Sequence, residues 1–522
     1  MPPASPEPRG LLLAQTPADA TTAIVIGGLG RTRDLEFSRF QRLLWFVDAA
    51  HRQPAPAALP VSQLEIAAVE TLAPEQITAV VERFLRLNPR RLPALFVTDA
   101  ILATHSAAYP ALIERVHAEI EDTRRARITR QQDGFTWQKH RLRNARAYAQ
   151  HRLPAAWAGA LRGIPAFVCG AGPSLDISIA PLAAHAQSAV IFSADSALRA
   201  LARHGVQADF AVSTDVAKLP EKCLPDQLPP RRVVLSSISP PAWQDALPQP
   251  PLFISGHQLT DDWFAAQGVP RTALAASESC GSTAIDLALH LGCEPIYLFG
   301  LDLAVDPANQ ARRHQQDANP ELYLNSNYDP GAQLPRVPGN YAEKVPCFAL
   351  GDWRALDARL AARTTGKIYN VTDRGARLRG TTVVHPDHFT LSTPAFAKAP
   401  ALAALPDIAS ASNSGGSARE RRDDSPFATA STDAALARLR TAGERCVAAI
   451  PALRAALAQG GPVSLAAALR EFAIDPDCGR GVLGAFALKL MPHLVPPIEG
   501  DTAFWTALLD EYSELAQLAA TA

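Results

Sequence analysis

Ala166-Phe-Val-Cys-Gly-Ala-Gly-Pro-Ser-Leu175 joins an apolar run to a turn of small residues. The pattern predicts a buried strand over Ala166–Cys169, a tight turn over Gly170–Ser174 and then a helix. Glycines let backbone N–H groups approach a ligand, and a helix N-terminus adds partial positive charge. Pro173 presets φ for a first helical position, and Ser174 can cap the helix or donate to a phosphate. The stretch predicts an anion site of the phosphate type, with a tight connection that binds no ligand as the alternative.

The chain from residue 164 onward alternates apolar strands with helical segments. Three carboxylates, Asp195, Asp215 and Asp302, come just after such strands. The carboxyl ends of parallel strands lie on one edge of a sheet, where ligands bind. An Asp in this position also commonly caps the next helix. We expect strands over 166–169, 189–192, 210–213, 232–235, 252–255, 295–299 and 367–371.

A second small-residue stretch, Ser277-Glu-Ser-Cys-Gly-Ser-Thr283, precedes a closely packing helix over 284–290. Either Ser279 or Ser282 would cap that helix, and Gly281 lies between them. The start of the helix is therefore a second candidate anion site.

The fold prediction is α/β: a central Rossmann-like parallel-sheet domain similar to sialyltransferases, preceded by a smaller α/β domain and followed by a helical bundle. Gly27 to Gly30 follow an early strand but lack a full G-x-G-x-x-G, which favours a structural turn over a dinucleotide site. The Arg-rich segment after residue 124 favours a solvated helix, or a wall facing an anionic substrate, over a nucleic-acid surface. The expected divisions are 1–115 (α/β), 116–160 (helical connector), 161–395 (central domain), 396–432 (flexible linker) and 433–522 (helical domain).

Composition limits the function classes. The chain has 522 residues, a formal net charge of −1 and seven cysteines. This charge gives no reason to expect bulk attraction to nucleic acid or anionic membrane. The absence of a C-x-x-C pair argues against a zinc site and favours a reducing compartment. The N-terminus lacks the order of a secretion signal, and we expect no membrane span, so the predicted location is cytoplasmic.

Four stretches together carry a family resemblance: 170–175, 280–292, 295–304 and 370–376. The region from about 160 to 390 resembles the motility accessory factor (Maf) flagellin glycosyltransferases of the MptE-like superfamily. Its core is also similar to bacterial sialyltransferases. Two departures concern the substrate: Arg374-Gly375 stands where the family usually carries Gly-Gly, and Cys280 stands where Ser or Thr is common.

The resemblance implies transfer of a nonulosonic sugar, pseudaminic or legionaminic acid, from a CMP-activated donor to Ser or Thr of flagellin or a related surface protein. It implies that Asp195 and Asp215 contact nucleotide and sugar, and that two groups of residues bind the donor: Gly170, Gly172, Pro173 and Ser174, and Ser279, Gly281 and Ser282. The similar sialyltransferases use no metal for a CMP leaving group, so no cofactor is expected.

The expected mechanism is inverting, with Asp302 and a general base as catalytic groups. His314 is the candidate base because it lies in the polar segment 305–345 after Asp302, and His257 is held in reserve. Two other functions stay open. One is a Mg²⁺-dependent 6-hydroxymethylpterin diphosphokinase, with Asp195, Asp215 and Asp302 holding the metal. The other is a non-catalytic assembly factor with a nucleotide fold.

Overall fold

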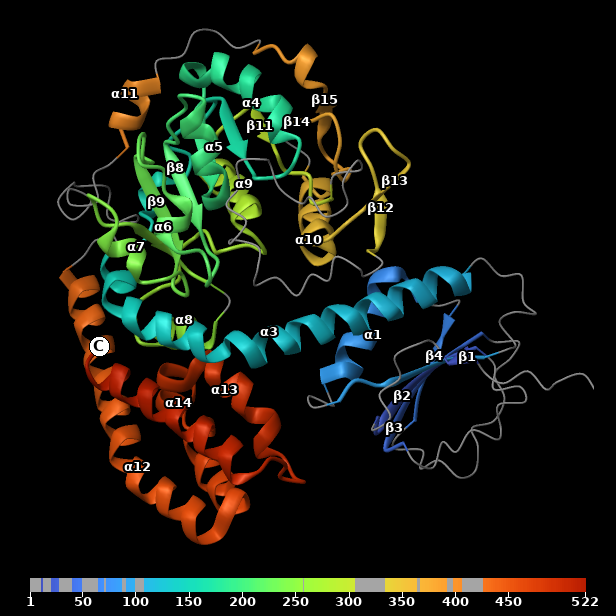
Figure 1. Cartoon of the computed structure of the whole chain (residues 1–522), viewed down its shortest axis with the longest axis vertical. Coiled ribbons are helices and arrows are strands. Elements are labelled where there is room, and N and C mark those ends of the chain that lie inside the picture. The colour runs from blue at the N-terminus through green and yellow to red at the C-terminus, as the bar shows by residue number, and fades with distance from the viewer. Residues whose placement is uncertain are drawn as a thin grey trace, which may run out of the picture. The chain divides into compact units, whose positions relative to one another are not determined.

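The computed structural model describes residues 11–12, 20–27, 40–48, 64–69, 72–86, 91–98, 108–256, 258–305, 334–363, 367–391, 398–405 and 426–522. These residues form two compact units, Met1–Gln132 and Asp133–Ala522 (Figure 1). The long helix α3 (Ala108–Gln150) contributes its first part to one unit and its last part to the other. The expected boundary at 115 thus falls inside α3, and the C-terminal helices belong to the same unit as the central sheet.

The first unit is built on a sheet of order β1-β5-β2-β3-β4. Strands β2 to β5 pair in parallel, and β1 is antiparallel to β5. Gly27 follows β2 with φ 101°, and its carbonyl accepts a hydrogen bond from Trp45 Nε1 at 2.7 Å. Gly27 therefore serves the turn itself. The bounds are β1 (Leu11–Leu12), β2 (Thr22–Ile26), β3 (Arg42–Val47), β4 (Leu64–Ala68), β5 (Ala94–Val97) and α1 (Pro74–Arg86).

The second unit contains an eight-stranded, fully parallel sheet of order β10-β9-β8-β7-β6-β11-β14-β15. Sequential strands from β6 run outward on one side, and β11, β14 and β15 run outward on the other. The direction reverses between β6 and β11. The strands are β6 (Ala166–Cys169), β7 (Val190–Ala194), β8 (Phe210–Ser213), β9 (Arg232–Ser236), β10 (Leu252–Ile254), β11 (Ile296–Phe299), β14 (Ile368–Val371) and β15 (Thr382–Val384).

Helices cover both faces of this sheet because its strands are apolar on both sides. In β6, Phe167 and Cys169 face one core while Ala166 and Val168 face the other. The first core also takes helices α4, α5 and α8, and the second takes α9 and α10. This doubly wound arrangement confirms the predicted α/β fold. The helices are α4 (Leu175–Ala184), α5 (Leu198–Arg203), α6 (Pro220–Cys223), α7 (Ala242–Asp245), α8 (Leu259–Ala266), α9 (Cys280–His290), α10 (Leu350–Ala361) and α11 (Lys398–Ala403).

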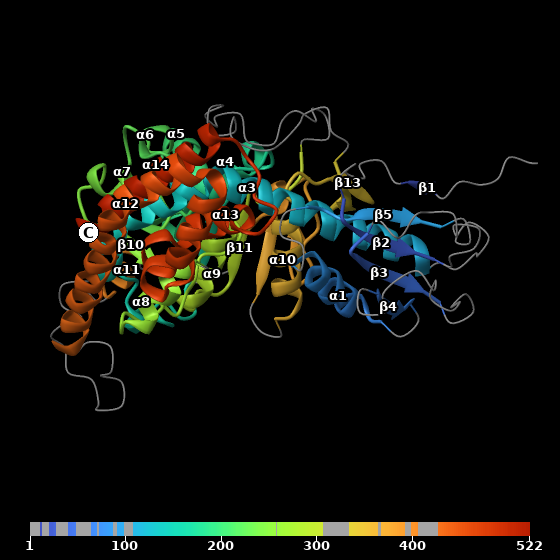
Figure 2. The same ribbon diagram turned by 90° about the horizontal axis from the view of Figure 1, so that it is seen from below.

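The C-terminal helices pack beneath α8 and the end of α3 (Figures 1 and 2). They are α12 (Pro426–Ile474), a π-helix (Pro476–Leu483), α13 (Gly484–Leu490) and α14 (Thr502–Ala520). Helices α12 and α14 lie in close contact, and a Cβ on Gly443 would overlap the backbone nitrogen of Ala520. Part of the expected flexible linker, residues 406–425, lies outside the described residues; its flanks are helical, in α11 and α12.

By length and composition, one described helix segment, Ser431–Ile474, could cross a membrane, with mean hydropathy 1.2 in its most apolar window. This differs from the expectation that no apolar run is long enough. In this fold the segment contains Pro451 and Pro462, is non-helical at Gly461 and packs along α14.

The expected strands match the observed ones to within one or two residues at each end. The prediction missed strand β1 and two further features. Strand β15 was not predicted, and the end of the supposed loop 305–345 forms an antiparallel pair, β12 (Arg336–Pro338) and β13 (Lys344–Pro346). Residues 306–333 of that loop lie outside the described residues.

Candidate active site

The carboxyl edge of the eight-stranded sheet brings the strand-end residues into one row. Gly170 follows β6, Asp195 follows β7, Thr214 follows β8 and Gly300 follows β11. The chain direction reverses between β6 and β11, and open α/β sheets bind ligands at such a reversal. The row is therefore the candidate active site.

The glycine turn after β6 is filled by a carboxylate of the protein itself. The Ser174 N–H donates to Asp302 Oδ2 at 2.7 Å, and the Gly172 N–H donates to the Gly300 carbonyl at 2.7 Å. A Cβ on Gly172 would lie 2.5 Å from Asp302 Oδ2 and 2.7 Å from Gly300 O. Gly172 is thus required by the close approach of the segment that follows β11.

This arrangement differs from the expectation that Gly170, Gly172, Pro173 and Ser174 hold the donor phosphate. The Gly170 N–H is also used, donating to the Phe299 carbonyl at 2.8 Å. The Gly170, Gly172 and Ser174 amides are therefore committed to the 299–302 segment, and Pro173 has no N–H. Asp302 takes the place in the amide cradle that a phosphate oxygen would otherwise take.

Asp302 is a positioning group in this geometry. Its side chain is 3% exposed, and Thr372 Oγ1 donates to its Oδ1 at 3.3 Å. Burial raises the pKa of the Asp302 carboxyl, and the hydrogen bonds from Ser174 act in the opposite direction. The carboxylate ties the end of β11 to the turn after β6 and to Thr372 after β14, without an exposed oxygen for catalysis.

Asp195 is likewise saturated by internal donors. Its Oδ1 accepts from the Ser196 N–H at 2.6 Å and from Ser196 Oγ at 2.9 Å. Its Oδ2 accepts from Ser213 Oγ at 2.8 Å and from the Cys280 thiol at 3.3 Å. Asp195 thereby connects the ends of β7 and β8 to the start of α9.

Asp215 has different surroundings. Its Oδ1 accepts from the Ala217 N–H at 2.8 Å, whereas its Oδ2 has no hydrogen bond to any described residue. Burial raises the pKa of the Asp215 carboxyl; the Ala217 hydrogen bond and Lys218 lower it, and the charge of Asp195 raises it. Asp215 is thus the strand-end carboxylate with an available oxygen and a pKa shifted towards neutrality.

The N-terminus of α9 lies beside Asp215. The Thr214 N–H approaches Cys280 Sγ at 3.3 Å, and the charges of Asp195 and Asp215, after burial, raise the pKa of the Cys280 thiol. Ser279 caps α9 by accepting from the Ser282 N–H at 3.2 Å, and its hydroxyl donates to Ser282 Oγ at 3.0 Å. The two serines satisfy each other, so their side chains do not point to a ligand role. First-turn amides have no intrahelical acceptor, and those of Cys280 and Gly281 are not taken by the cap.

Both small-residue bends lie at this edge, but an aliphatic side chain separates them. A Cβ on Gly170 would lie 2.7 Å from Leu301 Cδ2, and one on Gly281 would lie 2.6 Å from the same atom. Leu301 is 6% exposed. The structure therefore brings Asp195, Asp215 and the start of α9 together, and it assigns the turn at 170–174 to packing against the end of β11.

The far end of the row holds residues that the sequence reasoning missed. His385 follows β15, and its ring lies edge-on to Tyr341, whose hydroxyl donates to the Thr372 carbonyl at 3.1 Å. A short apolar run precedes His385 in the sequence. The same pattern, a strand followed by a polar residue, identified Asp195 and could have identified His385. The two expected base candidates, His314 and His257, lie outside the described residues.

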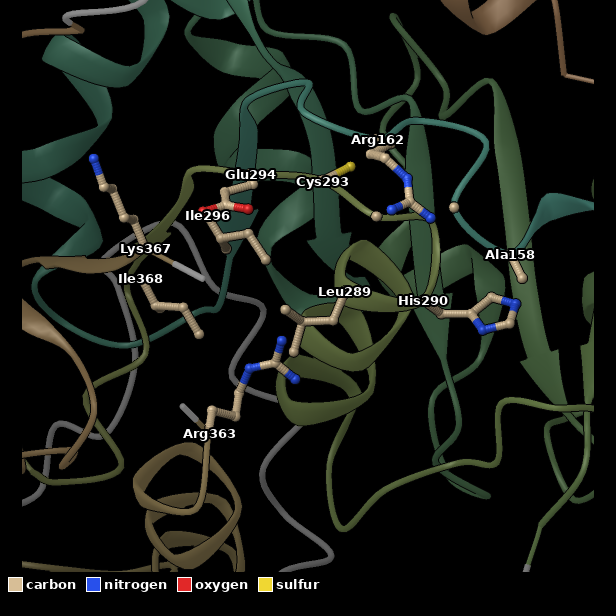
Figure 3. A pocket seen from close by; sticks show the side chains of 12 residues that line it. Ala158, Arg162, Leu289, His290, Cys293, Glu294, Ile296, Arg363, Lys367 and Ile368 are labelled. Atoms are coloured by element: carbon tan, nitrogen blue, oxygen red, sulfur yellow. The ribbon is translucent and has the colours of Figure 1, made fainter. Parts of the chain in front are cut away.

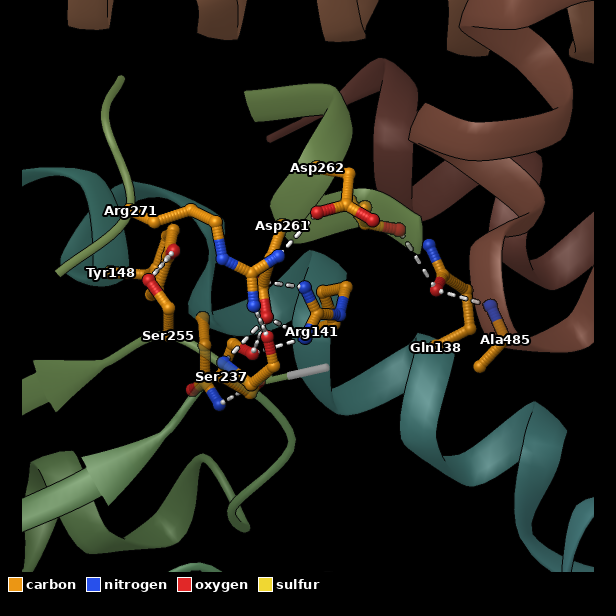
Figure 4. Close-up of polar contacts among 12 residues, drawn as sticks. Gln138, Arg141, Tyr148, Ser237, Ser255, Asp261, Asp262, Arg271 and Ala485 are labelled. Carbon is orange, nitrogen blue, oxygen red and sulfur yellow. Dashed lines mark hydrogen bonds and ion pairs between the residues drawn. The ribbon is translucent and has the colours of Figure 1, made fainter. Parts of the chain in front are cut away.

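A buried polar network holds α3 across the ends of β9 and β10 (Figure 4). Arg141 pairs with Asp261 and donates to Ser237 Oγ, and both charged side chains are at most 1% exposed. Tyr148 OH lies 3.0 Å from Ser255 Oγ. This network occupies the β9–β10 part of the edge, whereas Thr214 and Asp215, just after β8, are half-buried.

Gln138 connects α3 to the C-terminal helices. Its Nε2 donates to the carbonyls of Gly481 and Val482 at 3.1 and 2.9 Å, and its Oε1 accepts from the Ala485 N–H at 3.1 Å. The π-helix at 476–483 frees carbonyls that an α-helix would use, and Gln138 satisfies them.

The described residues contain no group of three or more His, Cys, Asp or Glu side chains arranged to hold a metal ion. Asp195 and Asp302 follow strands separated by β6, which places their strands about 10 Å apart. The set Asp195, Asp215 and Asp302 proposed for Mg²⁺ therefore does not converge.

One family model matches the central part of the chain. Residues 139–307 match the family model described as 6-hydroxymethylpterin diphosphokinase MptE-like, which confirms the MptE-like resemblance of this segment. The Maf glycosyltransferase from Magnetospirillum magneticum AMB-1 is similar in structure, with 18% identity, a TM-score of 0.48, and coverage of 96% of this chain and 78% of that one. The search of curated proteins found no match.

Proposed function

We propose that this chain is a glycosyltransferase that moves a nonulosonic, sialic-acid-like sugar from a CMP-activated donor to a Ser or Thr hydroxyl of a flagellin-like protein. The sugar class and acceptor come from the motif resemblance within residues 160–390. One observation carries the site: Asp215, with an available oxygen and a raised pKa, lies beside the N-terminus of α9.

In this proposal the start of α9 stabilises the leaving group. The amides of Cys280 and Gly281 point out of the first turn, and the helix dipole favours negative charge there. The bond from the anomeric carbon to the phosphate oxygen breaks, and CMP leaves with the electron pair. Fixed dipoles stabilise the charge that develops on a leaving group, and this effect is a large part of such catalysis.

The general base in the proposal is Asp215. The acceptor oxygen forms the new bond to the anomeric carbon from the face opposite to CMP, and its proton passes to the available oxygen of Asp215. A carboxyl whose pKa is raised is a better proton acceptor near neutral pH than an ordinary Asp. Asp195 and Asp302 act by holding the strand ends in place.

Replacement of Asp215 by Asn tests this role. We expect kcat for transfer from CMP-pseudaminic or CMP-legionaminic acid to fall by about 10²–10⁴-fold, with CMP binding by calorimetry changed little. The acidic limb of the pH–rate profile should also be lost, because the Asp215 carboxylate is required above its raised pKa. The matched control is Asp226→Asn, the same change in charge at another Asp of the unit. Full activity in Asp215→Asn would reject Asp215 as the base.

A second candidate function is supported by the description of the matching family model, which names a pterin diphosphokinase. That chemistry needs Mg²⁺ held by carboxylates. Calorimetry with CMP, CTP and ATP, each with and without Mg²⁺, separates the candidates. Metal-independent CMP binding supports the transferase, and binding of ATP only with Mg²⁺ supports the kinase. Failure of every nucleotide to bind supports a non-catalytic assembly factor.

A further inference from the structure

A cavity of about 380 Å³ lies at the amino edge of the eight-stranded sheet, opposite to the candidate active site (Figure 3). Its floor is the start of β11 and β14, at Ile296 and Ile368. Four other segments contribute its walls: the turn at 158–162, the end of α9 at His290, the residue pair 293–294, and residues 363 and 367.

Three cationic side chains come to this cavity: Arg162 from the turn at 158–162, Arg363 from just after α10, and Lys367 from just before β14 (Figure 3). No hydrogen bond or ion pair joins any of the three side chains to another described residue. Glu294 is the carboxylate of the lining. In a chain of net charge −1, the cavity lining alone carries a charge of about +2, counting His290 as neutral because burial lowers its pKa.

A neighbouring cavity contains an arginine that is paired with carboxylates. It shares Leu289, His290 and Arg363 with the first. There Arg359 is neutralised by Glu278 at 2.6 Å and lies 3.4 Å from Asp286. Burial raises the pKa of the Asp286 carboxyl, and the charges of Arg359 and Arg363 act in the opposite direction, but Arg363 forms no ion pair with it. Arg359 therefore has carboxylate partners, whereas Arg162, Arg363 and Lys367 form no ion pair with a described residue.

The wall that carries Arg162 is held firmly. The Gly159, Leu161 and Gly163 N–H groups donate to the carbonyls of 290, 291 and 292 at 2.8, 2.7 and 3.1 Å. A Cβ on Gly292 would lie 3.0 Å from Gly159 Cα, so Gly292 allows the turn to lie against the end of α9. The backbones that present Arg162 and His290 are thus fixed relative to each other, which lowers the ordering cost of binding.

We propose that this cavity binds a small molecule through its phosphate or pyrophosphate group, at a site separate from the carboxyl edge. Arginine forks match phosphate oxygens bidentately, and Lys367 adds a point charge. The cavity volume admits a ligand of a few to a few tens of non-hydrogen atoms. Its position at the opposite edge makes it a second site, independent of the transferase proposal.

Calorimetry with inorganic pyrophosphate at low salt tests the site. We expect the double variant Arg162→Gln/Arg363→Gln to bind at least about 10-fold more weakly than the wild type, because each charge-assisted hydrogen bond is a strong one. Glu294→Gln should bind more tightly, since it removes the one negative charge of the lining. Asp215→Asn, at the other edge, should leave this binding unchanged.

The matched control is the double variant Arg143→Gln/Arg440→Gln, which removes two positive charges from exposed positions on α3 and α12. Because the substituted arginines are exposed, circular dichroism and the melting temperature of both double variants should match the wild type. Three outcomes would overturn the proposal: no binding to the wild type, equal binding by Arg162→Gln/Arg363→Gln, or an equal loss in the control variant, which would indicate general electrostatic attraction.

Discussion

Replacement of Asp302 should separate a structural anion from a catalytic one. In Asp302→Ala the Ser174 N–H loses its buried acceptor at 2.7 Å, and Thr372 Oγ1 loses its contact at 3.3 Å. A hydrogen bond to a charged group contributes about 1.5–3 kcal/mol, and a buried N–H left unpaired adds to the loss. We therefore expect Asp302→Ala to lower the free energy of unfolding by about 3 kcal/mol.

Asp302→Asn should cost much less, about 1 kcal/mol or below, because an amide oxygen of the same shape can still accept from Ser174. The pH dependence gives a second test. Burial raises the folded-state pKa of Asp302 above the unfolded value of about 3.9, so the wild type loses stability as pH rises through that interval. Asp302→Asn lacks this loss, and its stability relative to the wild type should improve from acidic to neutral pH.

Urea unfolding of both variants between pH 4 and 7, followed by circular dichroism, measures these differences. Hydrogen exchange of the peptide containing Ser174 gives a local measure, and its amide should exchange faster in Asp302→Ala. Equal losses in the two variants would refute the view that Asp302 serves as an acceptor for the turn. An Asp302→Ala protein with wild-type stability would refute it as well.

Three further predictions concern other parts of the second unit. Gly443→Ala should lower the melting temperature, since the new Cβ overlaps the α14 backbone and overpacking typically costs about 1–3 kcal/mol; a wild-type melting curve would contradict the close contact. Gln138→Leu should lower the free energy of unfolding, measured in urea, by about 2–4 kcal/mol, because it leaves buried carbonyls of the π-helix unpaired. Gln138→Glu would keep only the hydrogen bonds that the side chain accepts, such as that from the Ala485 N–H. Cys280 should react with iodoacetamide at pH 8 far more slowly than free cysteine, because burial and the nearby carboxylates raise its thiol pKa; mass spectrometry that found rapid labelling would disprove this.

The parallel sheet was predictable from local sequence. Continuous apolar runs such as Phe210–Ser213 and Ile296–Phe299 are typical of strands buried on both faces, and the helices between them fix a parallel order. Strand β15 escaped prediction because three residues, Thr382–Val384, carry too short a pattern. The C-terminal helices were recognised, but their union with the sheet depends on long-range contacts such as Gln138 to Gly481.

The carboxyl edge as the location of the site could also be inferred, because strand-end polar residues share an edge in any parallel sheet. Which of them remain available could not. Asp195, Asp215 and Asp302 look alike in sequence, each an aspartate shortly after an apolar strand. Their hydrogen-bond partners come from distant segments, Cys280 for Asp195 and Ser174 for Asp302.

The amino-acid sequence by itself determined the doubly wound sheet, its two glycine-containing bends and the edge where polar groups gather, because these follow from apolar periodicity and chain direction. Only the tertiary structure decided that Asp302 fills the bend after β6, that Leu301 separates the two bends and that Asp215 keeps an oxygen available. These results depend on contacts between residues that are far apart in the sequence, such as Ser174 and Asp302. Side-chain packing, rather than local pattern, determines such contacts.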